Sequence, residues 1–154
     1  MQWVYRKGEL ARDGWDVVVD NSLPSWQHTG LRVGTLSELG GHGKLHLPAD
    51  DKERVIFAAA SSGLSISYRL VGHSEFATQK LAGRASVFAG PTDIIYLPME
   101  TEVIIEGDGR VLIGETAATD LKPVKFIATS DVPVFIRGAG REPRGAQLWW
   151  ARRP

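Results

Sequence analysis

Few side chains in this sequence are of a type and spacing that could perform chemistry, and the histidines are the main candidates. His42 and His46 are four residues apart, which turns both side chains to the same face of a strand. Glu53 or Glu38 could then lie nearby, because imidazole and carboxylate together bind divalent metals. Glycines on both sides of His42 favour a loop instead, so the alternative is a pair of solvated histidines.

Three other groups of residues have side chains that occur in binding or catalytic sites. Arg84 and Asp93 could bind the carboxylate of a sugar acid by bidentate contact, although a surface ion pair is the commoner arrangement. Residues 61–63 lack the Gly-x-Ser-x-Gly pattern of a nucleophile elbow. Residues 107–109 have too few glycines for a dinucleotide-binding loop, and a hairpin explains them better.

The composition excludes several classes of protein. Lys and Arg number 18, as do Asp and Glu, so no net charge attracts nucleic acid. The longest apolar run, residues 55–60, is too short to span a bilayer, and the N-terminus lacks the layout of a secretion signal. We therefore expect a cytoplasmic protein without nucleic-acid or membrane partners. Cysteine is absent, which excludes disulfides and thiolate chemistry.

The elements that must position these residues are short strands. Runs rich in Val, Ile, Phe and Tyr are separated by Gly, Pro, Asp or Ser, a pattern typical of β-sandwiches and barrels. Helix is expected to be scarce, with at most one turn at residues 116–121. The predicted strands are residues 16–20, 29–38, 43–48, 54–60, 64–71, 84–88, 94–98, 102–106, 110–114, 124–127 and 132–137.

Two strand features carry more specific predictions. Val55, Ile56 and Phe57 are consecutive, which predicts a strand covered on both faces. Asp108 and Gly109 are typical of a tight type I′ turn, so residues 103–106 and 110–113 should form a hairpin.

Four separate stretches together carry a family resemblance: residues 5–10 with Gly14 and Trp15, residues 81–88 leading into 90–93, residues 96–98, and residues 131–140. They are similar to the 5-deoxy-glucuronate isomerase family of inositol catabolism, whose members are two fused cupin domains. The resemblance implies that residues 1–140 form a cupin-type jelly roll, all-β with little helix. It also implies that the family's divalent metal lies in a second cupin, which this chain does not contain.

The cupin metal motif itself is not matched in this domain. With Gly63 as the anchor, Ile56 stands where the motif has its glutamate. Val103 stands five residues after Pro98, where the motif has its third histidine. Because aliphatic side chains cannot bind a cation, we expect no metal, catalytic or cofactor-binding residue in this domain.

Residues 141–154 differ from the rest of the chain. They are rich in arginine, contain Trp149 and Trp150 and show no strand alternation. Possible codons of residues 145–154, read one base later, give a continuation similar to the family's linker, so one hypothesis is a frameshifted remnant of the linker to a missing second cupin. The other is a basic arm whose tryptophans are buried in a partner.

Three functions follow from these patterns. The first, implied by the resemblance, is participation in the conversion of 5-deoxy-glucuronate, an aldose acid, to its ketose isomer, with this half expected to be inactive alone. The second is a non-catalytic structural domain that forms homo-oligomers through its sheet faces or its tryptophan tail, or whose exposed sheet pairs with a separate catalytic half. The third is a stand-alone cupin that binds a small sugar acid.

Overall fold

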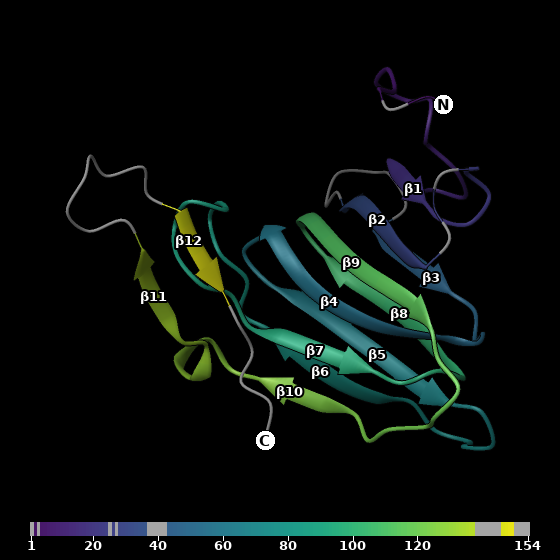
Figure 1. Cartoon of the computed structure of the whole chain (residues 1–154). Coiled ribbons are helices and arrows are strands. Elements are labelled where there is room, and N and C mark those ends of the chain that lie inside the picture. The colour runs from purple at the N-terminus through teal and green to yellow at the C-terminus, as the bar shows by residue number, and fades with distance from the viewer. Residues whose placement is uncertain are drawn as a thin grey trace.

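The protein is described by a computed structural model for residues 2, 4–24, 26, 28–36, 43–137 and 146–149. Across these residues there is no α-helix, and two antiparallel sheets form a sandwich (Figure 1), which confirms the all-β prediction. The six-stranded sheet has the order β1 (Val17–Val19), β2 (Thr29–Leu36), β9 (Gly109–Ala117), β4 (Lys52–Ala60), β7 (Ile94–Leu97) and β10 (Lys125–Ile127). The four-stranded sheet has the order β3 (Lys44–Leu47), β8 (Thr101–Gly107), β5 (Leu64–Leu70) and β6 (Ala77–Leu81).

Two short elements lie outside these sheets. A single 3-10 turn covers Thr129–Asp131. Beyond it β11 (Val134–Arg137) pairs with β12 (Ala146–Trp149), antiparallel, in a sheet of its own. Residues 146–149 form a strand although the tail shows no strand alternation, because β11 supplies a hydrogen-bonding partner that the tail's own sequence pattern does not reveal.

The core lies between the two sheets, where alternate side chains of each strand point inward. Ile56 and Ile113 come from the six-stranded sheet, and Ile66 and Ile105 come from the four-stranded sheet; all four are fully buried. Burial of such a side chain stabilises the fold by about 1.5–3 kcal/mol. The predicted alternation of residues 64–71 is confirmed, since Leu64 and Ile66 are buried and the residues between them are not.

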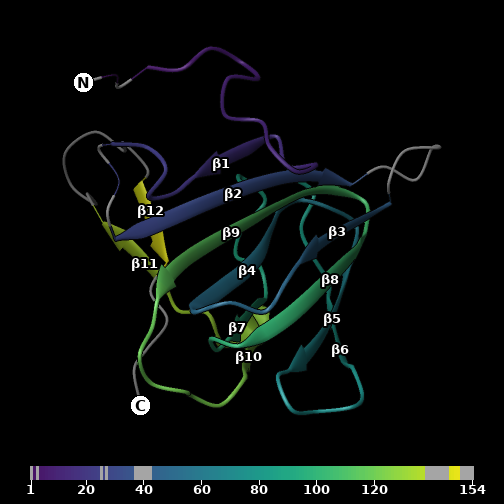
Figure 2. The same cartoon turned by 90° about the vertical axis from the view of Figure 1, so that its right-hand side faces the viewer.

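The segment 107–109 is not a hairpin, because β8 and β9 belong to different sheets (Figure 2). It carries the chain from one sheet to the other, with positive φ at Gly107 and Gly109. A side chain at Gly109 would collide with the carbonyl oxygen of Ala60, so only glycine fits there. Hydrogen bonds from Ser62, through its amide and hydroxyl, and from Ser61 hold the Asp108 carboxylate in this bend and lower its pKa.

The structure also differs from the sequence pattern in several single elements. Residues 84–88 form a turn, held by a 2.8 Å hydrogen bond from Nη1 of Arg84 to the oxygen of Gly90. Residues 116–121 contain no helical turn, since β9 continues to Ala117. The strand β6 was missed because its polar residues show no apolar alternation. Val55 is 36% exposed, so the strand that carries it is covered on one face only.

Candidate functional site

Charged side chains face inward at one end of the six-stranded sheet. Arg54 on β4 shares the inward face with Ile56, and Glu115 on β9 shares it with Ile113. The antiparallel register of β4 and β9 places Arg54 opposite Glu115. Their exposed fractions are 1% and 2%, so two ionised groups lie in the sandwich interior. Such burial is tolerated only when the charges are paired and hydrogen-bonded.

Glu115 is the centre of the ion-pair network. Its Oε1 lies 2.9 Å from Nε of Arg32 and 3.8 Å from Nζ of Lys52, and its Oε2 lies 3.2 Å from Nε of Arg54. Nη2 of Arg54 also donates to Oδ2 of Asp50 at 2.6 Å. We refer to Arg32, Lys52, Arg54, Asp50 and Glu115 as the interior charge cluster.

The interior charge cluster carries an unused donor. Three cationic side chains face two carboxylates, which leaves one positive charge. Among the residues that the structure describes, Nη1 of Arg54 is buried without a hydrogen-bond partner. A buried N–H group without a partner carries a desolvation penalty of about 1–3 kcal/mol, more for a charged group, which an acceptor that reached this atom would offset.

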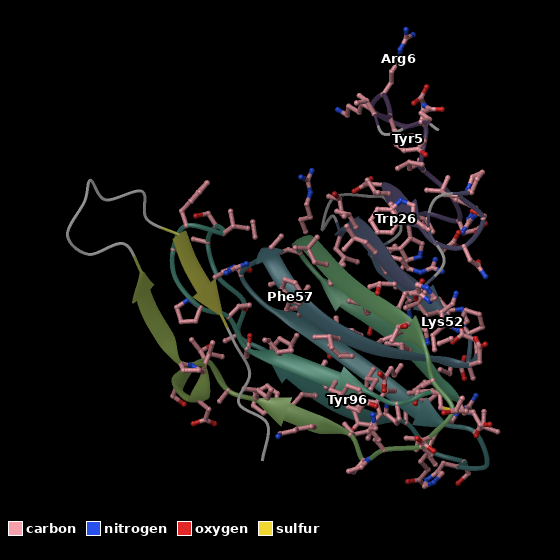
Figure 3. All side chains as sticks on the ribbon, in the orientation of Figure 1. Tyr5, Arg6, Trp26, Lys52, Phe57 and Tyr96 are labelled. Carbon is pink, nitrogen blue, oxygen red and sulfur yellow. The ribbon has the colours of Figure 1, made fainter. Side chains whose placement is uncertain are left out.

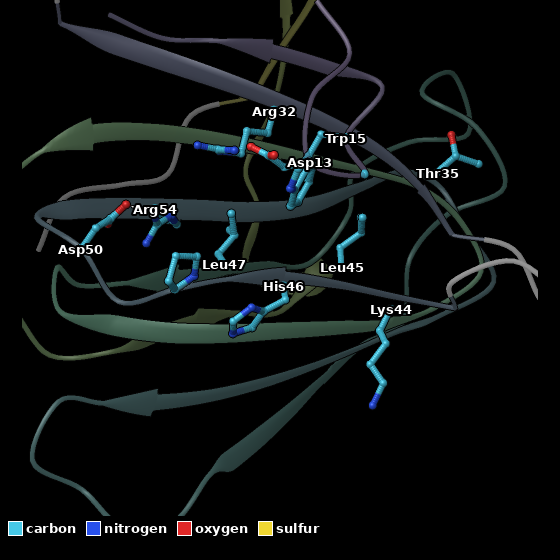
Figure 4. Close-up of a pocket in the computed structure, with 12 residues that line it drawn as sticks. Asp13, Trp15, Arg32, Thr35, Lys44, Leu45, His46, Leu47, Asp50 and Arg54 are labelled. Carbon is cyan, nitrogen blue, oxygen red and sulfur yellow. Dashed lines mark hydrogen bonds and ion pairs between the residues drawn. The ribbon is translucent and has the colours of Figure 1, made fainter. Parts of the chain in front are cut away.

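A cavity of about 800 Å³ opens beside the interior charge cluster (Figure 4). Arg32, Arg54 and Asp50 line it together with Trp15, Leu45 and Leu47. Leu45 and Leu47 project into the interior between the sheets, whereas Lys44 points away from it. The guanidinium carbon of Arg32 lies 5.8 Å from the centre of a Trp15 ring, a distance typical of a cation–π contact.

Two glycines on β2 make room for this arrangement. A Cβ atom at Gly30 would come within 2.9 Å of Cγ of Glu115, and one at Gly34 would collide with Leu45 and crowd Trp15. Both positions therefore require glycine because a larger side chain would overlap with its neighbours, and not because of their backbone angles. The cavity thus combines apolar walls with a few convergent polar groups, as small-molecule sites do.

The histidine site expected from the sequence is not assembled by the described residues. Nε2 of His46 lies 2.9 Å from Oε1 of Glu102, on the outer surface of the four-stranded sheet. Glu53 lies on the outer surface of the other sheet, where it accepts a 2.7 Å hydrogen bond from the Tyr96 hydroxyl. His42 and Glu38 lie outside the described residues.

Arg84 and Asp93 serve the turn between β6 and β7. Asp93 accepts hydrogen bonds from the amides of Ala82 and Gly83, while Arg84 donates to Gly90. Burial lowers the pKa of the Arg84 guanidinium. Both polar groups therefore stabilise the backbone of this turn, and the structure does not join them into a carboxylate-binding pair.

The donor set of the family's metal is not present in the part of the chain that the structure describes, where no three His, Asp or Glu side chains gather around one point. At the two positions compared with the cupin motif, Ile56 and Val103 are fully buried in the apolar core. The described residues therefore do not fit a divalent cation.

Sequence reasoning missed the interior charge cluster, although a signal for it was present. Val111, Ile113 and Glu115 alternate along one strand, so the same pattern that buries the two aliphatic residues also buries the glutamate. The predicted strand ended at Gly114, one residue too early to show this. Arg54, at the start of a strongly apolar run, is the complementary signal.

These features define an all-β sandwich of the cupin-like class with a charged cavity at one end. The chain belongs to the KduI/IolB family, which matches residues 3–148. This confirms the resemblance to the 5-deoxy-glucuronate isomerase family and relates the chain to sugar isomerases. The match extends past Gly140, into the segment that we expected to stand apart.

A solved structure supports the same assignment. The crystal structure of an IolB-like protein from Salmonella typhimurium LT2 is similar, with a TM-score of 0.69 and 25% sequence identity. The similarity covers 85% of this chain and 48% of that chain, so this protein spans about half the length of the solved relative. No curated protein matches the chain. None of the described residues form a helix long and apolar enough to cross a bilayer.

Proposed function

We propose that this chain is the part of an aldose–ketose isomerase that binds the acidic sugar, and that it holds the substrate's carboxylate in the cavity beside the interior charge cluster. The observation that carries the proposal is the buried Arg54 at the cavity wall, whose Nη1 has no partner among the described residues. A planar guanidinium matches a carboxylate in two parallel hydrogen bonds, so arginine suits this ligand better than lysine would.

The family supports the choice of ligand. Membership of the KduI/IolB family favours a 5-deoxy-glucuronate-type substrate, an aldose that carries a carboxylate. Two arginines of the cavity wall, Arg32 and Arg54, supply positive charge for that carboxylate.

The same cavity is poorly equipped for proton transfer. Isomerisation needs a base that is free to move a proton between adjacent carbons. Asp50 and Glu115 are both held in ion pairs with Arg54, so neither carboxylate is free to approach a substrate carbon. We therefore expect binding without turnover from this chain alone.

Calorimetric titration tests the binding. D-glucuronate should bind and D-glucose should not, because only the former carries the charge that Arg54 and Arg32 recognise. The variant Arg32→Gln should weaken glucuronate binding by about tenfold, since one charge-assisted contact is worth about 1.5 kcal/mol or more. Arg110→Gln, on the outer surface, is the matched control and should bind like the wild type.

Two results would reject the proposal. Equal binding of glucose and glucuronate would show that charge is not recognised, and unchanged binding in a folded Arg32→Gln protein would place the ligand elsewhere. An assay for ketose formation, with and without added divalent cation, separately tests the expected lack of turnover.

A further inference from the structure

The outer surface of the six-stranded sheet carries two adjacent rows of mostly apolar side chains, one of which crosses all six strands. One row of side chains runs from Val19 on β1 through Leu31, Gly114 and Val55 to Tyr96 on β7, as the strand register requires. The row beside it begins at Val17 and ends at Ile127, is apolar throughout and includes Phe57 (Figure 3). We refer to these two rows as the outer apolar face.

The outer apolar face is open at its centre. Leu31 is 41% exposed and Val55 is 36% exposed, and these two residues flank Gly114 on the neighbouring strands. No described atom lies within 4 Å of the place where a Cβ atom of Gly114 would stand. A continuous apolar surface that the described residues leave uncovered is typical of an interface.

The size of the outer apolar face fits a reversible interface. Six strands at a spacing of about 4.8 Å span about 29 Å, and a patch five residues long spans about 16 Å. The projected area is therefore about 500 Å² per copy, so pairing would bury about 1,000 Å², near the lower limit for a specific protein interface. A dimer of moderate affinity is expected from this area.

We propose that two copies of this chain pair face to face through the outer apolar face. The partner must present a flat apolar surface of the same width with charge only at its rim, and this surface on a second copy meets that requirement. In the described part of the face, the charged groups Glu53, Arg110 and Lys125 lie at its edges. Two copies carry no net charge, so long-range repulsion does not oppose their association.

The four-stranded sheet is a poor alternative surface for this contact. Its outer side carries the ion pairs Lys44–Glu106, at 3.1 Å, and Arg69–Glu102, at 2.6 Å. Burial of these exposed charges would add a desolvation penalty that apolar contact does not offset. An isologous pairing of the two six-stranded sheets avoids this penalty.

Gly114 provides the sharpest test of the proposed dimer. Its φ is not in the left-handed region and space is open beside it, so the monomer accommodates Gly114→Glu. In the dimer, a second sheet about 10 Å away would bury the new carboxylate. The wild type should change from monomer to dimer in sedimentation velocity over about 1–100 µM, the range of a moderate interface, and Gly114→Glu should raise the dimer Kd at least tenfold.

Ser65→Glu is the matched control, because it adds the same side chain to the outer side of the four-stranded sheet. It should dimerise like the wild type. Leu31→Lys is a second disrupting variant on a different strand, and thermal melts of all three proteins verify that they are folded. A wild type that stays monomeric throughout, or a folded Gly114→Glu protein that dimerises like the wild type, overturns the proposal. Sugar-acid binding is measured separately and does not depend on this result.

Discussion

In the six-stranded sheet the buried charges face inward and the outer surface is apolar, whereas in the four-stranded sheet the inner surface is apolar and the charges face outward. Leu45, Ile66 and Ile105 illustrate the apolar inner surface of the smaller sheet. Its outward His46 and Arg69 both contact Glu102. The smaller sheet therefore has one buried apolar face and one solvated polar face. The larger sheet has charged side chains beside the cavity on its inner face and exposed apolar side chains on its outer face. The difference locates both proposed interactions on the larger sheet.

The largest effect should come from breaking the inward charges of the larger sheet. Glu115→Leu leaves Arg54 and Arg32 without their shared carboxylate in the interior, which should lower the free energy of unfolding by about 3–5 kcal/mol. Urea denaturation measures this loss. Lys44→Met, which breaks an outward ion pair of the smaller sheet, should change it by less than about 1 kcal/mol. Similar losses in both variants would contradict the contrast between the sheets.

A second test compares two glycines of the same strand, β9. Gly109→Ala introduces a side chain at positive φ, where it collides with the Ala60 carbonyl, and should destabilise the protein by about 2 kcal/mol or more. Gly114→Ala lies on the open apolar surface and should be neutral or stabilising by up to about 1 kcal/mol. Thermal melts at low protein concentration, where monomers dominate, compare the two. An equal loss at Gly114 would show that its surroundings are not open.

The smallest expected effects are on the pH dependence of stability. The larger sheet should respond at alkaline pH and the smaller sheet at acidic pH. Burial and the hydrogen bond to Glu53 raise the pKa of Tyr96 to about 12 from 10.0. A raised pKa favours the neutral phenol in the folded state, so this stabilisation is present below pH 10 and is lost as the pH rises through 12. Ultraviolet titration of tyrosinate should show one late step, which Tyr96→Phe removes.

In the smaller sheet the linkage has the opposite sign. Hydrogen bonds from His46 and then Arg69 lower the pKa of Glu102 below its ordinary 4.5. The charged carboxylate is therefore favoured in the folded state, and its contribution is present above pH 4.5 and lost as the pH falls. Carboxyl-carbon NMR titration measures this pKa, and His46→Gln should move it upward. An unchanged value in that variant would show that His46 does not stabilise the charge.

Much of the fold and less of the site could be predicted from the sequence. The strand at residues 64–70 and the family resemblance depend on local alternation and on short ordered motifs, which the chain displays directly. The expectation of no metal site was based on spacing alone, and it remains a prediction. The interior charge cluster was missed because Arg54 and Glu115 are 61 residues apart and meet only through strand pairing.

The sequence by itself determined the all-β class and the family, because a two-residue period and family motifs are properties of neighbouring residues. Only the tertiary structure decided which strands share a sheet. Gly107 and Gly109 looked like a hairpin, yet they cross between sheets, since the partners of β8 and β9 come from distant parts of the chain. The same long-range pairing decided which surface of each sheet is buried, and with it where charge is enclosed and where an apolar surface stays open.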